Sequence, residues 1–208
     1  MPTGVWYGIT TNPLILQRCG VKCNFETLKK LALDAHALGA EELQLQTWGE
    51  SVEDMVGNGQ LLGAMGVGDM EIVVKVPITA RGLTAASRLI EEGVPITMTG
   101  VYAPHQVVAA AAVGASYAAP YLGRMNDAGR DGMVSCMQMQ EIIDNAGSEM
   151  RLLVASVRNL REVTELAAHG CNTFTLGAAV AEAMYADPLT NAAAAEFEQC
   201  ARDGGAYD

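Results

Sequence analysis

Basic, aromatic and histidine residues are scarce in this chain of 208 residues. Lys and Arg number 13 against 24 Asp and Glu, for a net charge of -11, and aromatic residues make up 5%. Binding to nucleic acid or to an anionic membrane depends on clustered cations, so this composition argues against both partners. No apolar run approaches the roughly 18 residues of a membrane span.

The five cysteines are an odd number, and no charged-then-apolar leader follows Met1. Both features indicate a reducing compartment without disulfides. The cytoplasm is therefore expected, the alternative being an organelle reached with a transit peptide since removed. The three histidines have no cysteine pair nearby at zinc-finger spacing, so we expect no metal site.

Half of the residues are hydrophobic, and no charge block or low-complexity linker divides the chain, which predicts a single domain over residues 1–208. Short apolar runs alternate with longer amphipathic stretches from end to end. Seven runs are short enough for strands and unbroken enough to be buried on both faces, as in a parallel sheet. They are Val5–Ile9, Leu43–Thr47, Ile72–Val76, Val94–Met98, Ser116–Ala119, Leu152–Ala155 and Thr173–Leu176.

Helix start signals lie between these runs. Asn24 precedes one amphipathic stretch, Ser51 with Asp54 forms a capping box, and Pro104 suits a first helical turn. Strand–helix alternation predicts either an open doubly wound sheet or a closed barrel. No G-x-G-x-x-G motif follows the first strand, and the even spacing favours a (β/α)8 barrel. A complete barrel takes about 250 residues and eight strands, so the sequence predicts a barrel that lacks its first βα unit, on the order of thirty residues.

Reactive groups of such barrels lie at the strand ends, and six consecutive strands here end in polar residues. They are Thr11 and Asn12, Gln46, Lys75, Thr99 and Tyr102, Tyr121 and Arg124, and Ser156 and Arg158. Lys75 stands within an apolar strand, where burial would lower its pKa and produce the neutral amine that a Schiff-base nucleophile requires. The alternative is a lysine whose stem is buried and whose amine reaches the rim.

The other strand-end residues have structural alternatives as well. Asn12 before Pro13 is also a turn residue, Gln46 a hydrogen-bonding group inside a barrel, and Thr99 an ordinary strand residue. Arg124 and Arg158 either hold a phosphate through paired hydrogen bonds or are surface charges.

Four motifs, in this order and spacing, resemble the small transaldolases and fructose-6-phosphate aldolases. They are Gly8–Pro13 (GITTNP), Val73–Thr79 (VVKVPIT), Ala119–Arg124 (APYLGR) and Ala155–Arg158 (ASVR). The resemblance covers essentially the whole chain. It implies a TIM barrel of the class I aldolase type that acts on ketose phosphates without a cofactor.

The resemblance also implies roles for individual residues. Lys75 forms an iminium with the C2 carbonyl of a ketose, and cleavage of C3–C4 releases an aldose phosphate and leaves a dihydroxyacetone enamine. Asn12, with the neighbouring Thr11, binds the dihydroxyacetone unit, and Gln46 and Thr99 position a water. The phosphate is bound by Arg124, Ser156 and Arg158.

Two positions indicate which branch of the family the chain resembles. Transaldolases usually carry Glu where this chain has Gln46 and Phe where it has Tyr121, whereas the fructose-6-phosphate aldolases carry Gln and Tyr. The pair favours cleavage to dihydroxyacetone and glyceraldehyde 3-phosphate, with Tyr121 in acid–base catalysis, over transaldolase transfer in the pentose phosphate pathway. An aldolase for deoxyribose phosphate is a third possibility, against which the TTNP element argues.

The chain departs from the family pattern at its N-terminal end. There the TTNP element belongs to the second strand, and a first strand ends in a proton-transferring Asp, whereas the first Asp of this chain is Asp34, on a predicted helix. The competing hypothesis is therefore a catalytically impaired barrel that serves as an oligomeric scaffold. Two short helices divided near Pro188 are predicted over 178–201, either covering the barrel or packing on a neighbouring subunit. From the family we expect a homo-oligomer, a pentamer or decamer.

Overall fold

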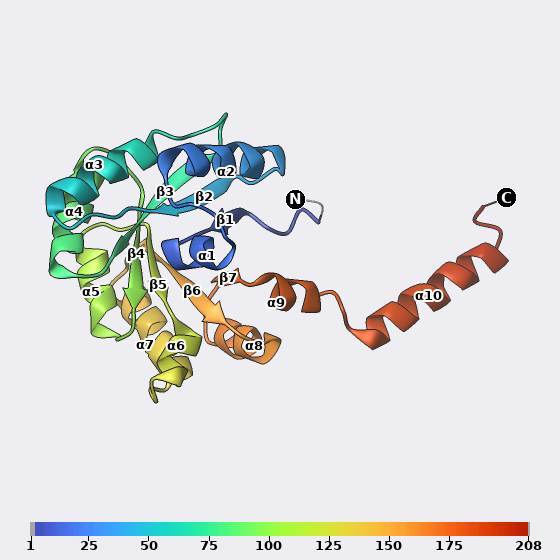
Figure 1. Ribbon diagram of the computed structural model, residues 1–208. Coiled ribbons are helices and arrows are strands. Elements are labelled where there is room, and N and C mark those ends of the chain that lie inside the picture. The colour runs from blue at the N-terminus through green and yellow to red at the C-terminus, as the bar shows by residue number, and fades with distance from the viewer. Residues whose placement is uncertain (1–2, 208) are drawn as a thin grey trace.

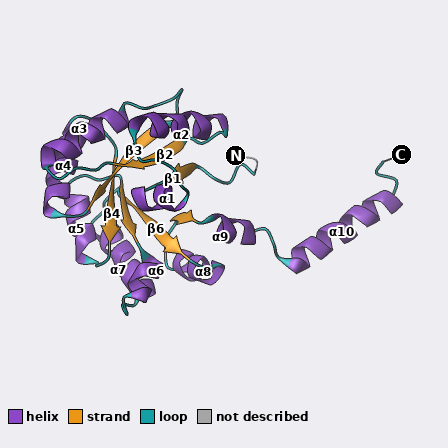
Figure 2. Cartoon of the chain, in the orientation of Figure 1, coloured by secondary structure: helices purple, strands orange, loops and turns teal. Residues whose placement is uncertain are grey.

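The computed structural model describes residues 3–207 as a nearly closed barrel of seven parallel strands with helices around it (Figures 1 and 2). The strands are β1 (Gly8–Thr10), β2 (Glu42–Gln46), β3 (Glu71–Pro77), β4 (Ile96–Val101), β5 (Tyr117–Pro120), β6 (Arg151–Val157) and β7 (Thr173–Leu176). The helices are α1 (Pro13–Arg18), α2 (Phe25–Ala37), α3 (Val52–Gly63), α4 (Ala80–Glu91), α5 (His105–Ala112), α6 (Leu122–Asp127), α7 (Gly132–Asn145), α8 (Leu160–Ala168), α9 (Ala178–Ala183) and α10 (Pro188–Asp203).

The strands follow one another around the barrel in chain order, each hydrogen-bonded in parallel to the next. This arrangement confirms the predicted α/β barrel and its seven strands. Parallel neighbours need a crossover between them, and the helices provide it, which is why strands and helices alternate in the sequence.

The first strand is shorter and later than Val5–Ile9, so that prediction was wrong at its N-terminal end. Pairing of β1 with β2 begins only at Gly8, opposite Glu42, and ends at Thr10. Val5 and Tyr7 precede this ladder and are 58% and 52% exposed. Apolar sequence alone does not make a strand where no partner strand runs alongside.

A gap separates β1 from β7. Within residues 3–207 no backbone ladder joins these two strands, and the hydroxyls of Thr10 and Thr175 share one hydrogen bond of 2.8 Å across the gap. A cavity of about 670 Å³ lies there, lined by both strands and by Trp6, Val163 and Met184. Six of the seven pairs of neighbouring strands around the barrel are therefore joined by hydrogen-bonded ladders, and the pair β7 and β1 is not.

The sheet buries two distinct apolar layers because alternate residues of a strand face opposite sides. Val74 and Val76 pack with the helices in the outer layer, whereas Val73 belongs to a small cluster with Tyr117 and Leu153. That second cluster joins β3 to β5 and β6, neither of which is adjacent to β3, so its residues meet inside the barrel. Lys75, two residues after Val73, therefore faces the interior.

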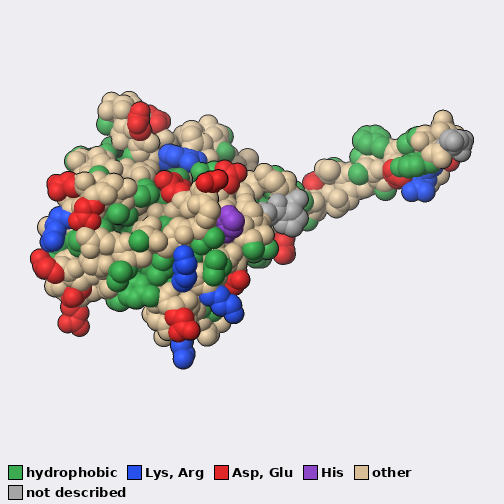
Figure 3. Space-filling view, turned by 90° about the horizontal axis from the view of Figure 1, so that it is seen from above, with side chains coloured by type: hydrophobic (Ala, Val, Ile, Leu, Met, Phe, Trp, Pro, Cys, Tyr) green, Lys and Arg blue, Asp and Glu red, His purple; other side chains and the backbone are tan. Residues whose placement is uncertain are grey.

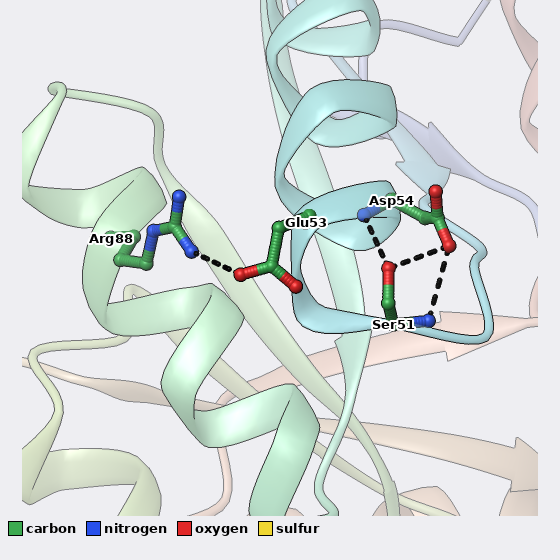
Figure 4. Close-up of polar contacts among 4 residues, drawn as sticks. All are labelled: Ser51, Glu53, Asp54 and Arg88. Carbon is green, nitrogen blue, oxygen red and sulfur yellow. Dashed lines mark hydrogen bonds and ion pairs between the residues drawn. The ribbon is translucent and has the colours of Figure 1, made fainter.

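Two predicted helix starts are confirmed by their hydrogen bonds. The Asn24 side chain accepts from the Thr27 amide, and Ser51 and Asp54 form a reciprocal capping box at α3 (Figure 4). Such caps satisfy amides that have no partner within the helix. Pro104 stands at the cap of α5 rather than in its first turn. Between α3 and α4, Arg88 donates to Glu53 at 3.3 Å (Figure 4).

The C-terminal helices leave the barrel. Pro188 begins α10, as the predicted division requires, but α10 has no buried residue and projects away from the barrel body (Figures 1 and 3). The alternative that it covers the barrel is therefore wrong for α10. Among the described residues no helix has both the length and the apolar character to cross a membrane.

The packing of α4 against β3 gives a stability prediction. A Cβ at Gly82 would lie 1.9 Å from the Pro77 carbonyl oxygen, whereas a Cβ at Gly57 in α3 meets nothing within 4 Å. Gly82→Ala should lower the free energy of unfolding by about 1–3 kcal/mol through overpacking, and Gly57→Ala should raise it by about 0.5–1 kcal/mol. Urea denaturation of both variants measures this; equal effects would contradict the packing.

Candidate active site

Lys75 lies in the middle of β3 and is only 3% exposed. Its backbone neighbours in register are Gln46 on β2 and Thr97 on β4. Burial lowers the Lys75 pKa from 10.5 to about 8, while the negative charge of Glu42 opposes this shift. A substantial fraction of the amine is thus neutral near physiological pH, as nucleophilic attack requires. The alternative of an amine that reaches the solvated rim does not fit this burial.

Thr99 and Tyr121 meet at the carboxyl end of the strands, beyond the position of Lys75. Thr99 is on β4 opposite Pro77, two residues beyond Lys75, and Tyr121 directly follows β5. Their hydroxyl groups share a hydrogen bond of 2.8 Å. The structure therefore brings these two predicted residues together at the carboxyl end of the barrel, on the same side as Gln46.

Thr11 and Asn12 follow β1 at the same end. Thr11 Oγ1 donates to the Gln44 carbonyl at 3.2 Å, and Asn12 Oδ1 accepts from the Ile15 amide at 2.8 Å, which caps α1. The structural role considered for Asn12 is therefore real. It engages Oδ1 and leaves the amide nitrogen as a donor for another group.

Arg124 is held by aromatic residues. It lies on α6, with its guanidinium 4.7 Å from the centre of the Tyr121 ring, and its Nη1 donates to the Tyr102 hydroxyl at 3.4 Å. The Tyr102 and Tyr121 rings meet edge to face at 5.6 Å. Cation–π contact and a donated hydrogen bond both restrict this guanidinium beside Tyr121.

Ser156 and Arg158 end β6 close to α6. Ser156 has φ of +60°, a strained value for a non-glycine residue, and a Cβ at Gly123 would lie 2.5 Å from the Ser156 carbonyl oxygen. Glycine at position 123 is thus required for this close approach. Arg158 donates through both terminal nitrogens to Asp127, one bond being 2.7 Å, and holds the Asp127 pKa below its usual value.

Sequence reasoning did not find the Asp127 partner of Arg158, nor a polar network inside the barrel. Glu42 and Gln44 are buried on β2, and Tyr117 on β5 donates to Glu42 at 2.7 Å. The signal for the network was present in Glu42–Gln46, where polar residues alternate with leucines at the two-residue period of a strand.

The β1–β7 cavity is separate from the strand-end residues, since none of the nine predicted site residues lines it. In residues 3–207 no group of three or more His, Cys, Asp or Glu side chains is close enough to hold a metal ion.

The fold and the site define a class: a parallel α/β barrel with a buried strand lysine of lowered pKa and polar residues at the strand ends. Comparison with known families is more specific. The family model for Transaldolase/Fructose-6-phosphate aldolase matches residues 1–207. The chain belongs to this family and is an enzyme of the transaldolase type.

Curated relatives of similar length agree. A probable transaldolase of Hydrogenobaculum sp. (strain Y04AAS1) is 34% identical over 188 residues, which cover 90% of this chain and 83% of the relative. A probable transaldolase of Maridesulfovibrio salexigens is 34% identical over 197 residues, covering 93% and 87%. One of Desulfosudis oleivorans is 35% identical over 191 residues, covering 90% and 84%.

A solved structure supports the fold alone. The GMP reductase C318A of Trypanosoma brucei, in complex with guanosine 5'-monophosphate, superposes with a TM-score of 0.52 over 66% of this chain and 31% of its own. The two sequences are 14% identical.

Burial of Lys75 gives a prediction for stability against pH. With a pKa of about 8 in the folded state and 10.5 as its ordinary value, the unfolded chain binds the proton more tightly between these values. The contribution of Lys75 to stability therefore falls as the pH drops from 10.5 to 8 and is constant below. At pH 7 Lys75→Met should raise the free energy of unfolding by about 3 kcal/mol.

The measurement is urea denaturation of wild type and variant from pH 7 to pH 10.5. The difference in free energy of unfolding between Lys75→Met and wild type should become smaller as the pH rises. Lys30→Met on the exposed face of α2 is the matched control and should change little. If Lys75→Met had a lower free energy of unfolding than wild type at pH 7, burial of the amine would not destabilise the fold, and the prediction would be wrong.

Proposed function

We propose that this enzyme cleaves ketose phosphates by class I aldol chemistry, as a fructose-6-phosphate aldolase does, with Lys75 as the nucleophile. The observation that carries the proposal is the Lys75 amine, buried in β3 and 3% exposed. A buried amine loses its proton more readily than an exposed one. Gln46 is opposite Lys75 on β2, and Thr99 on β4 is opposite Pro77, two residues beyond Lys75.

The covalent step begins when Lys75 Nζ attacks the C2 carbonyl of the ketose. The resulting carbinolamine loses water to give an iminium, which withdraws electrons from C3. The C3–C4 bond then breaks, its electron pair forms the enamine, and the C4 hydroxyl loses its proton as the aldehyde leaves. Protonation of the enamine at C3 and hydrolysis of the iminium release dihydroxyacetone and the free amine.

The proton carriers in this proposal are the hydroxyls of Thr99 and Tyr121, with a water held by Gln46. Their hydrogen bond of 2.8 Å supports the relay, because a proton taken by one oxygen can pass to the other. Asn12 donates to the dihydroxyacetone unit through its free amide nitrogen, with Thr11 beside it.

The phosphate is proposed to bind Arg124, Ser156 and Arg158. The approach of α6 to the end of β6 at Gly123 and Ser156 supports this, since it brings both arginine-bearing segments together. Asp127 occupies two donors of Arg158 and so orients the guanidinium, whose third nitrogen can contact phosphate.

The reaction is proposed to run in the cytoplasm, which agrees with five cysteines that are all free. Between aldolase and transferase chemistry, Gln46 and Tyr121 support the aldolase. A neutral amide beside the water and a phenol near the nascent C4 oxygen favour release of the dihydroxyacetone unit rather than its transfer.

Borohydride trapping tests the nucleophile. Incubation with dihydroxyacetone or fructose 6-phosphate, then reduction, should give a mass adduct that peptide mapping places on Lys75, because reduction turns the reversible iminium into a stable secondary amine. Lys75→Met should give none, and Lys30→Met should give the wild-type amount. Glyceraldehyde 3-phosphate released without an acceptor supports the aldolase, and release only with an aldose phosphate acceptor supports the transferase.

Folded wild-type protein that carries no adduct on Lys75 would refute the proposal. It would favour the scaffold hypothesis, in which an impaired barrel assembles without turnover.

We also propose that the protein is a homo-oligomer, a pentamer or decamer, in which α10 packs on a neighbouring subunit. Leu189 and Phe197 on α10 are 80% and 70% exposed, and with Ala193 between them they recur every four residues along the helix. A helix keeps such a stripe when a partner covers it.

Sedimentation velocity tests the assembly. Wild type should sediment as an oligomer, and Leu189→Asp with Phe197→Asp should shift it to smaller species because the buried stripe becomes charged. Gln199→Ala, a polar position on the same helix, should leave the oligomer intact. A monomeric wild type would contradict the proposal.

A further inference from the structure

Two ionisable side chains of opposite charge are buried in the barrel. Among the Asp, Glu, Lys and Arg residues of 3–207, Glu42 and Lys75 alone are buried, at 5% and 3% exposure. They lie on neighbouring strands, β2 and β3. A buried charge is stable only when it is paired or hydrogen-bonded, so each requires an explanation.

The Glu42 carboxylate is held by donors from both directions. Gln44 Nε2 donates to Oε1 at 2.8 Å, and the Tyr117 hydroxyl donates to Oε2 at 2.7 Å. Tyr117 is on β5, which is not adjacent to β2, so this bond crosses the barrel interior. Arg151 Nη1 in turn donates to the Tyr117 oxygen at 3.2 Å. Each carboxylate oxygen of Glu42 therefore accepts one hydrogen bond.

Hydrogen-bonded side chains lead from Glu42 to Thr97, on the strand next to Lys75. The Gln44 side chain that donates to Glu42 accepts from Thr97 Oγ1 at 3.0 Å, and Thr97 is the β4 neighbour of Lys75 in register. The Gln44–Thr97 bond passes across the interior face of β3, the strand that carries Lys75. Because both side chains are buried, their opposite charges attract more strongly than they would in solvent.

The other charged groups near Glu42 and Lys75 are exposed to solvent. Tyr7 precedes β1, Glu71 begins β3 and Arg151 begins β6, all of them exposed. On β5, Tyr117 donates to Glu42, and Tyr121 follows the strand. The interior residues of β4 and β7 are threonines at Thr97, Thr99, Thr173 and Thr175. Among the described residues Glu42 is therefore the one buried carboxylate, and its strand position is opposite Glu71, four residues before Lys75 on β3.

We propose that Glu42 is the counter-ion of Lys75, stabilising the positive charge that the Lys75 nitrogen carries as an iminium. The inference rests on the proposed function. Loss of water from the carbinolamine turns a neutral nitrogen into a cation that burial disfavours, and a fixed carboxylate offsets that cost. Glu42 acts on the nitrogen through its field and touches no reacting atom, so it is a positioning residue.

The test removes the charge while keeping the size. Glu42→Gln and Glu42→Met are two neutral variants, the second with an apolar side chain that suits a buried site if the first does not fold. Glu42→Asp keeps the charge. Glu41→Gln, at the exposed neighbouring position, is the matched control. Circular dichroism and thermal unfolding establish that each variant is folded.

Two measurements follow the charge on Lys75. Competitive labelling with a small acylating reagent, quantified on the Lys75 peptide against pH, needs no substrate and reports the Lys75 pKa. In the neutral variants its midpoint should fall by about one pH unit, since the ammonium loses its counter-charge. Borohydride trapping at saturating dihydroxyacetone should give roughly tenfold slower adduct formation, the equivalent of one pKa unit. Glu42→Asp and Glu41→Gln should keep values near wild type.

The two proposals fail differently. An unchanged labelling midpoint in a folded neutral variant overturns the counter-ion, and so does a Glu42→Asp midpoint that falls as far as that of Glu42→Gln. Absence of trapping in wild type refutes the Schiff-base function, while a midpoint that falls in the neutral variants still establishes that Glu42 sets the charge of Lys75.

Discussion

The burial of one amine inside a parallel sheet is the constraint on which this structure depends. Lys75 faces the barrel interior, where its pKa falls to about 8 because solvation of the ammonium is lost. A lysine in that place destabilises the fold unless its surroundings compensate. The interior contains Glu42, Gln44 and Thr97 in one hydrogen-bonded network, whereas the outer faces of the same strands are apolar. Chemistry and packing are thus divided between the two faces of each strand.

At the carboxyl end of the barrel the proposed site has two halves. Near Lys75, Thr99 and Tyr121 form a hydroxyl pair suited to moving protons. Farther along, the approach of α6 to β6 gathers the arginine-bearing segments, and Tyr121 links the two halves because its ring also lies under Arg124. A displacement of Tyr121 would therefore disturb both proton transfer and the phosphate half of the proposed site.

Much of the fold and of the site was predictable from the sequence. Seven parallel strands, the caps at Asn24 and Ser51, and the burial of Lys75 follow from short-range patterns of polar and apolar residues. The expected burial on both faces is wrong for β1 and β7, which are only partly buried beside the gap. The extent of β1 was mispredicted because pairing, not composition, decides where a strand begins. Asp127 was missed because it pairs with Arg158, 31 residues away, and no local pattern encodes that contact.

The sequence by itself determined the class of barrel, the strand lysine and the family motifs, since these depend on residue type and on regular spacing along the chain. Tertiary structure alone decided that Glu42 and Tyr117 meet across the interior, that Asp127 orients Arg158, and that α10 leaves the barrel. Each of these depends on distances between residues far apart in sequence, which closure of the sheet sets and which no periodicity records.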